Sequence, residues 1–346
     1  MMVLDTGSSG WVGAVAFYPD GRHFLGGGGE AGVQRWRVSD GQEVRKQTGM
    51  DVYAISVSKD QKWIACGTKE GASVWDGEMH GKVIAVEGTN TVYAVDVSPD
   101  STRFATGTGN NASIWSIPSG ERLVGPLEHD TNLFATGIRF SANGEHIAIA
   151  CMEDSIRIFD SQTGDKLVII NTDILNAIPV IPLVWSSDEA HWQQIFAVSN
   201  NKIRAFDTST GTLLAESQTL HDGGNDTIHS IALAANNKFI ATSGDNLISF
   251  LDTSTLTRIG PDIENNKQLA SVTISADSSH LATARDDGKI IIRDLSKILP
   301  DSYGPFHIST CTFIMSTCQV IFIPSPMVIK LHRHLLTMEY DKRSSL

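Results

Sequence analysis

The chain has 346 residues, of which 41% are hydrophobic and 19% are charged, a balance typical of a globular protein with a substantial core. Its formal net charge of −12 argues against nucleic acid as a main partner, because such a ligand requires a basic surface. Four scattered cysteines are too few for a disulfide framework, and the first residues lack the features of a signal peptide, so we expect a cytoplasmic location.

A repeated unit starts close to the N-terminus. Each copy has a short apolar strand, a turn resembling Ser-Pro-Asp-Gly, a second apolar strand, and a third strand that ends in Trp-Asp or a variant of it. The dipeptides Asp20-Gly21 and Asn143-Gly144 are typical of hairpins that link such strands. The copies occupy residues 12–38, 52–77, 92–117, 135–160, 180–207, 228–252 and 270–294.

The tryptophan of the third strand sets the period of the repeat. Successive equivalents lie 39 to 47 residues apart, close to the roughly 40–45 residues of one propeller blade. One four-stranded blade cannot bury both of its faces, whereas blades stacked around an axis bury them against each other. The sequence therefore predicts an all-β fold, a seven-bladed β-propeller of four-stranded antiparallel blades, with these side chains packed between neighbouring blades. The equivalent positions are Trp36, Trp75, Trp115, Phe159, Phe206, Leu251 and Arg293.

These repeats resemble the WD-repeat (WD40) family over residues 1–297, and they look most like diverged WD-repeat proteins of fungi. The resemblance implies a non-catalytic protein–protein interaction scaffold that displays a face of loops to partner proteins or peptides. It leaves open a regulatory or substrate-receptor module of a larger signalling protein. The Gly-His dipeptide of the family is nearly absent, although His129 and His221 lie at the equivalent place and are expected to bond to Asp154 and Asp245.

The composition changes after residue 297. Residues 311–329 are strongly apolar and a basic patch follows, but two prolines leave an uninterrupted run shorter than the roughly 20 residues of a membrane-spanning helix. We expect residues 298–346 to be an irregular tail that does not cross a membrane, or a disordered or non-native gene end. The seventh unit lacks an outermost strand of its own. We expect residues 2–4 to supply it, with residues 312–323 as the rival segment.

Two short motifs suggest chemistry, but their surroundings argue against it. Asp5-Thr6-Gly7 resembles the active-site segment of pepsin-like aspartic proteases, whose mechanism needs two carboxylates that share a proton, and no second Asp-Thr/Ser-Gly occurs. Gly27-x-Gly29-x-x-Gly32 matches a dinucleotide-binding fingerprint, but a strand follows where that site needs a helix. The cysteines and histidines of the tail are spaced too widely for structural zinc. We expect no catalytic residue, cofactor, metal site or small-molecule substrate.

A ring of bulky residues is predicted at one mouth of the central channel. In the WD-repeat family, the residue that follows the first apolar position of each innermost strand lies near that mouth. Where the residue two positions before it is bulky, we include that residue in the ring as well. The ring is largely aromatic and apolar, and exposed clusters of this kind mark protein interaction sites. The alternative is that the rings tilt into the channel and pack on one another. The predicted partner-binding residues are Trp11, Tyr53, Tyr93, Phe134, Ile181 and His229.

Overall fold

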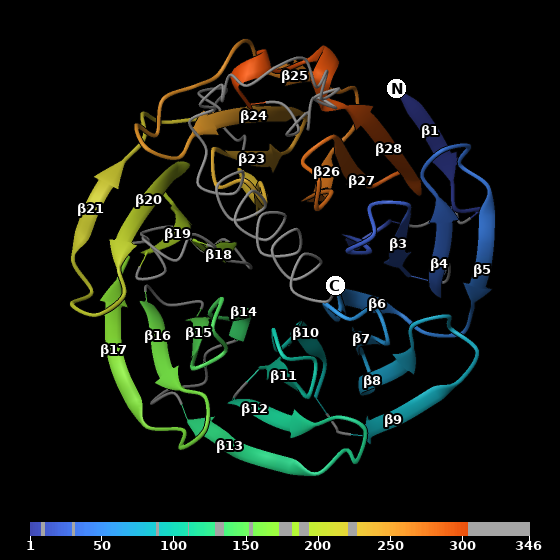
Figure 1. Ribbon diagram of the computed structural model, residues 1–346, viewed down its shortest axis with the longest axis vertical. Helices are drawn as coiled ribbons and strands as arrows, with labels where there is room; N and C mark the ends of the chain where they lie inside the picture. The colour runs from blue at the N-terminus through green and yellow to red at the C-terminus, as the bar shows by residue number, and fades with distance from the viewer. Residues whose placement is uncertain are drawn as a thin grey trace, which may run out of the picture. The chain divides into compact units, whose positions relative to one another are not determined.

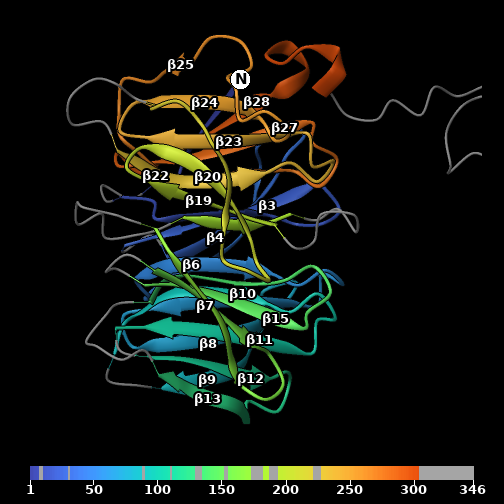
Figure 2. The same cartoon turned by 90° about the vertical axis from the view of Figure 1, so that its left-hand side faces the viewer.

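The repeats fold into seven antiparallel sheets of four strands each. The computed structural model describes residues 1–7, 11–29, 32–87, 90–109, 111–128, 135–151, 155–172, 182–186, 194–220 and 227–303. Within these ranges it contains 28 β-strands, two short 3-10 helices and no α-helix. Figure 1 shows the sheets following one another around a central axis, and Figure 2 shows the same sheets from the side. The predicted seven-bladed β-propeller is confirmed.

Blades 1 to 6 each take four consecutive strands, from the innermost to the outermost. Blade 1 consists of β2 (Ala14–Phe17), β3 (His23–Gly28), β4 (Gly32–Arg37) and β5 (Glu43–Gln47). Blade 2 consists of β6 (Val52–Val57), β7 (Trp63–Thr68), β8 (Gly71–Asp76) and β9 (Lys82–Glu87). Blade 3 consists of β10 (Val92–Val97), β11 (Arg103–Thr108), β12 (Asn111–Ser116) and β13 (Arg122–Glu128).

The second half of the ring repeats this pattern. Blade 4 consists of β14 (Ala135–Phe140), β15 (His146–Cys151), β16 (Ser155–Asp160) and β17 (Lys166–Asn171). Blade 5 consists of β18 (Leu183–Trp185), β19 (Gln194–Ser199), β20 (Lys202–Asp207) and β21 (Leu213–Glu216). Blade 6 consists of β22 (Ile228–Leu233), β23 (Phe239–Gly244), β24 (Leu247–Asp252) and β25 (Ile263–Glu264). Blade 7 combines β26 (Leu269–Ile274), β27 (His280–Arg285) and β28 (Lys289–Asp294) with the N-terminal β1 (Met2–Asp5).

The N-terminal strand closes the ring. β1 pairs antiparallel with β28, with Met2 opposite Ile292 and Leu4 opposite Ile290. The next residue, Thr6, donates a hydrogen bond from its hydroxyl to the carbonyl of Gly288 at 2.8 Å. A chain end that completes the last sheet joins the two ends of the propeller and covers the edge of β28. The predicted closure by residues 2–4 is confirmed, and the rival segment lies outside the described residues.

The aromatic position of the third strand packs between blades. Trp36 is 2% exposed, stacks on Phe24 at 5.2 Å, and lies in a cluster with Ile290 and Ile292 of β28 in the neighbouring blade. Close packing of this kind is what holds one blade to the next. The equivalents Phe159, Phe206, Leu251 and Arg293 are also buried, whereas Trp75 and Trp115 are half-buried.

The described chain continues to pack after the last strand. The 3-10 helices η1 (Leu295–Lys297) and η2 (Asp301–Tyr303) follow β28, and Leu295 and Leu299 are buried against blade 6. The hydroxyl of Tyr303 donates to Oδ2 of Asp252 at 2.8 Å. The predicted domain boundary at residue 297 remains a prediction. In the described part of the chain, no helix is long and apolar enough to span a membrane.

Candidate functional site

Three aromatic residues form a row at the start of the innermost strands of blades 1 to 3. Trp11 lies just before β2, and Tyr53 and Tyr93 are the second residues of β6 and β10. The ring centroids of Trp11 and Tyr53 lie 5.5 Å apart, and those of Tyr53 and Tyr93 lie 5.7 Å apart. The planes are inclined at 46° and 64°, the tilted and edge-on arrangements that aromatic pairs favour. The structure thus brings three of the predicted residues together across three blades.

The row is partly withdrawn from solvent. Trp11 and Tyr93 each keep 37% of their surface exposed, and Tyr53 between them is half-buried. The rings therefore pack on one another while the two outer rings remain accessible. Because each ring is supported by a neighbour and by its own strand, little side-chain freedom is left to be lost when a partner binds.

Glycines of blade 1 make room for Trp11. A Cβ atom on Gly13 would lie 1.8 Å from Cζ3 of the Trp11 ring, and one on Gly28 would lie 2.1 Å from the Trp11 carbonyl oxygen. Real Cβ atoms do not approach other atoms so closely, so both positions require glycine. The glycine-rich end of β3 therefore fixes where the first ring of the row lies.

Crowding of the same kind also explains two of the three glycines, Gly27 and Gly32, that match a dinucleotide-binding fingerprint. A Cβ atom on Gly27 would lie 2.9 Å from Cδ1 of Ile55 in blade 2. Gly32 has a φ of 67°, and a Cβ there would lie 1.9 Å from the carbonyl oxygen of Gln47. The segment after the motif is the strand β4, as expected, and a strand offers no helix N-terminus to a pyrophosphate.

Two carboxylates lie beside the middle ring of the row. Asp51 directly precedes β6, and Glu70 lies in the turn that leads from β7, the strand paired with β6, into β8. Burial raises the pKa of Tyr53, and Asp51, Tyr93 and Glu70 raise it further. A negative charge nearby disfavours the phenolate, so the Tyr53 hydroxyl stays protonated and neutral around pH 7. This part of the rim therefore combines neutral aromatic rings with carboxylates.

His229 is held in a polar cluster between blades 6 and 7. Its Nε2 atom lies 2.9 Å from Oδ1 of Asp245, and Nε2 of Gln268 donates to the same oxygen at 2.9 Å. The backbone N–H of Thr227 donates to Oδ2 at 3.0 Å. Burial acts to raise the pKa of Asp245, but these hydrogen bonds outweigh it and lower the pKa. The sequence predicted His221 as the partner of Asp245; the structure gives His229, and His221 lies outside the described residues.

The remaining predicted positions are not described by the structure. Phe134 and Ile181 lie outside the described residues, as does the predicted pair of His129 and Asp154. The partner-binding role of the six predicted residues remains a prediction. Among the described residues, no group of three or more His, Cys, Asp or Glu side chains is placed to hold a metal ion.

The segment that resembles a protease motif fastens the N-terminus. Oδ1 of Asp5 accepts a hydrogen bond from the N–H of Gly7 at 2.9 Å. The carbonyl of Thr6 accepts a bond of 2.7 Å from Nε2 of Gln34 in blade 1, and its hydroxyl reaches blade 7. These contacts give Asp5-Thr6-Gly7 a structural role in closing the ring.

Sequence reasoning missed a carboxylate that joins three blades. Oδ1 of Asp96 on β10 accepts a bond of 3.2 Å from the Ser56 hydroxyl of blade 2, and Oδ2 accepts one of 2.9 Å from the N–H of Phe140 in blade 4. Desolvation raises the pKa of Asp96, although the Arg139 guanidinium opposes it. The available signal was an acidic residue inside the apolar strand Val-Tyr-Ala-Val-Asp-Val.

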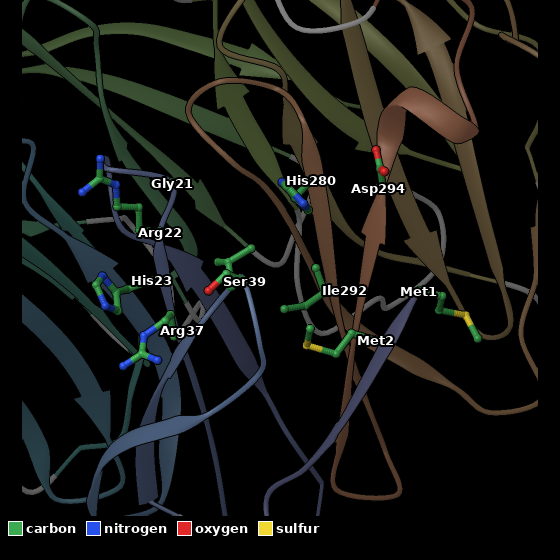
Figure 3. Close-up of a pocket in the computed structure, with 11 residues that line it drawn as sticks. Met1, Met2, Gly21, Arg22, His23, Arg37, Ser39, His280, Ile292 and Asp294 are labelled. Carbon is green, nitrogen blue, oxygen red and sulfur yellow. The ribbon is translucent and has the colours of Figure 1, made fainter.

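A separate cavity of about 650 Å³ lies at the seam between blades 7 and 1 (Figure 3). Its lining includes Gly21 and Arg22 of the turn between β2 and β3, whereas Trp11 precedes the other end of β2. At the corresponding position between blades 3 and 4, Arg103 fills the junction and donates to Gly144 and Ser161 at 3.0 Å each. In blade 7 the equivalent residue is His280, because it begins β27 as Arg103 begins β11. The histidine side chain is shorter than that of arginine. The lining residues are Met1, Met2, Gly21, Arg22, His23, Arg37, Val38, Ser39, His280, Ile292 and Asp294.

The chain is a seven-bladed β-propeller, as the number of sheets and their strand order show. Trp11, Tyr53 and Tyr93 contact one another across three of its blades. Residues 81–116, which hold β9 to β12, match the family described as "WD domain, G-beta repeat". The predicted resemblance to WD-repeat proteins is therefore confirmed.

Comparison with solved structures supports the same architecture. The crystal structure of the Cps50 (Swd1) beta-propeller domain of Myceliophteria thermophila is similar to this chain with a TM-score of 0.71 and 16% sequence identity. The match covers 85% of this chain and 99% of that domain. At this identity the likeness establishes the fold. No curated protein matches the sequence.

Proposed function

We propose that the chain is a non-catalytic scaffold that binds partner proteins or peptides at the rim formed by Trp11, Tyr53 and Tyr93. The observation that carries the proposal is the continuous row of rings, of which the two outer members are each 37% exposed. Tyrosine and tryptophan supply much of the binding energy at protein interfaces, because they bury a large rigid surface. Propellers of the WD-repeat family generally bind proteins, which agrees with this assignment.

We also infer that the scaffold works in the cytoplasm. Cys66 and Cys151 are buried and form no disulfide. Burial raises the pKa of the Cys66 thiol to about 12 and that of Cys151 to about 11, so both remain protonated and unreactive. Buried free thiols agree with a reducing compartment. Microscopy of the tagged full chain in its own cells tests this inference, and a signal confined to the secretory pathway would contradict it.

The test of the binding rim is affinity capture with mass spectrometry, using the full chain with Tyr53→Ala and Tyr93→Ala combined. We expect the double variant to keep its circular dichroism spectrum and to lose partners that the natural chain captures. The matched control is Leu213→Ala with Leu214→Ala on the outer strand β21, whose side chains are 48% and 49% exposed. If the tyrosine variant folds and retains every partner, the rim is not the binding site.

A further inference from the structure

Resting on the proposed function, we propose that the partner presents a cationic side chain, lysine or arginine, to the row of Trp11, Tyr53 and Tyr93. The ring faces and the carboxylates of Asp51 and Glu70 together receive this charge. The partner segment at this site is therefore basic.

The faces of the three rings attract a positive charge. The face of an aromatic ring carries a negative electrostatic potential, and a cation within about 6 Å of the centroid is attracted to it. The centroids of adjacent rings lie 5.5 Å and 5.7 Å apart and their planes are inclined, so each adjacent pair presents a face and an edge in different directions. A cation at the rim can therefore contact two rings at once.

Other aromatic rings of the same propeller bind cations of the chain itself. Four other aromatic side chains each carry a cation of their own over the ring, at 4.7 to 6.0 Å from its centroid. These pairs are Arg35 with Tyr18, Lys82 with Trp75, Arg103 with Phe140, and Arg122 with Trp115. Among the described residues, no Lys or Arg lies over Trp11 or Tyr53 in this way. Four rings elsewhere therefore receive a cation from the chain itself, whereas Trp11 and Tyr53 are open to a cation from a partner.

Negative charge lies beside the rings. Asp51 and Glu70 lie at the ends of paired strands next to Tyr53, close enough to act on its hydroxyl. Lys69 lies in the same turn as Glu70, so the side chains of Asp51, Glu70 and Lys69 together contribute a net charge of −1. The whole chain carries −12. A basic segment is drawn to such a surface and an acidic one is repelled, because opposite potentials steer association.

The experiment uses two probes of nearly equal size, tetramethylammonium and the neutral 2,2-dimethylpropan-1-ol. The full chain is labelled with 5-fluorotryptophan, which gives one fluorine resonance for each of seven tryptophans. The variant Trp11→Phe assigns the resonance of Trp11. We expect tetramethylammonium to move the Trp11 resonance saturably and the neutral alcohol to move it much less. Equal movement with both probes, or no movement with the cation, would overturn the proposal.

The carboxylates are tested with Asp51→Asn combined with Glu70→Gln, a change that keeps size and removes charge. We expect the affinity for tetramethylammonium to fall about threefold to tenfold, and the captured partners to be lost at lower salt than with the natural chain. The control is Glu43→Gln with Glu121→Gln, two exposed acids away from the rim. An unchanged affinity in the Asp51 and Glu70 variant would contradict the proposal.

The two proposals fail in different ways. If the Tyr53 and Tyr93 variant loses its partners while the Asp51 and Glu70 variant keeps them at all salt concentrations, the rim binds partners and the cationic inference is wrong. If the folded tyrosine variant keeps every partner, the proposed function is wrong and the cationic inference falls with it.

Discussion

Arg293 donates a hydrogen bond of 2.9 Å from Nη1 to Oγ1 of Thr283, at the position that tryptophan occupies in blade 3. There, Nε1 of Trp115 donates to Oγ1 of Thr106 at 3.0 Å. The registers agree, because Arg293 pairs with Leu281 as Trp115 pairs with Phe104. Blade 7 therefore preserves the hydrogen bond of the repeat after losing the aromatic ring.

We expect Arg293→Trp to stabilise the protein by about 1 kcal/mol. Burial, together with the charge of the neighbouring Arg285, lowers the pKa of Arg293 to about 10, so the folded state holds this cation at a cost. A tryptophan would retain the bond to Thr283 without the buried charge. Urea unfolding of both proteins measures the difference. Nη2 of Arg293 also donates a hydrogen bond of 2.5 Å to Oδ1 of Asn265. A variant less stable than the natural chain would show that this bond contributes more to stability than the buried charge costs.

Trp36→Ala is expected to lower the free energy of unfolding by about 3–5 kcal/mol, because it truncates a fully buried aromatic side chain. Trp115→Ala should cost about half as much, since the ring of Trp115 is half-buried. Denaturant unfolding with both variants gives the comparison. Equal losses would mean that exposure does not distinguish the two interblade positions.

The sequence predicted the features that depend on the period of the repeat. Spacing between Trp36 and Arg293 gave the number of blades, and the missing outer strand of the seventh unit indicated closure by residues 2–4. Both follow from local patterns, because strands and turns are encoded by neighbouring residues.

Features that depend on distant residues were less accessible. The bonds of Asp96 reach Ser56 and Phe140 in other blades, and His229 bonds to Asp245. The residues involved lie 16 to 44 positions apart, so only the folded ring brings them together. The inclination of the Trp11, Tyr53 and Tyr93 rings likewise depends on how three blades pack.

The first turn of several blades makes stability depend on acid. Asp60, Asp100 and Asp277 each accept hydrogen bonds from a serine hydroxyl and a backbone N–H of the turn. Burial acts to raise the pKa of each carboxyl, but these bonds outweigh it and lower the pKa. A lowered pKa means that the stabilisation is complete above the unfolded value of about 3.9 and is lost as the pH falls through the folded value.

We therefore expect the free energy of unfolding to fall as the pH decreases below about 5. Replacing Asp60, Asp100 and Asp277 with asparagine should flatten this decrease and lower stability near neutral pH. Asparagine is a fair substitute because Asn143 and Asn236 occupy the same turn position in blades 4 and 6 and accept the equivalent N–H at 3.1 and 3.0 Å. Unfolding by urea at several pH values measures both effects, and parallel pH profiles would refute the assignment.

The two ends of the chain should respond differently to deletion. Removing residues 1–6 takes away β1 and leaves β28 with an unpaired edge, so we expect a lower melting temperature and a tendency to aggregate. Removing residues 311–346 should leave a folded propeller, because the ring is closed without them. Thermal unfolding and size-exclusion chromatography test both truncations. If the C-terminal truncation is insoluble and the N-terminal truncation is stable, the C-terminal segment and not β1 is needed to close the ring.

Gly28→Ala is expected to move Trp11 without changing the chemistry of its ring. Gly28→Ala places a Cβ atom 2.1 Å from the Trp11 carbonyl oxygen and 2.7 Å from Cα of Val12, and backbone atoms cannot yield cheaply. We expect a loss of about 1–3 kcal/mol in unfolding free energy, a shifted Trp11 fluorine resonance and weaker capture of partners.

The matched control for this change is Gly29→Ala, one residue further along. Its Cβ would meet only Nε1 of Trp11, at an ordinary contact distance of 3.8 Å, so stability and partner capture should be nearly unchanged. Both variants add one methyl group beside Trp11, at its backbone for Gly28→Ala and at its ring for Gly29→Ala, so a difference between them reports displacement of the Trp11 backbone. If Gly28→Ala shifts the Trp11 resonance and capture is still complete, partners do not depend on where this ring lies.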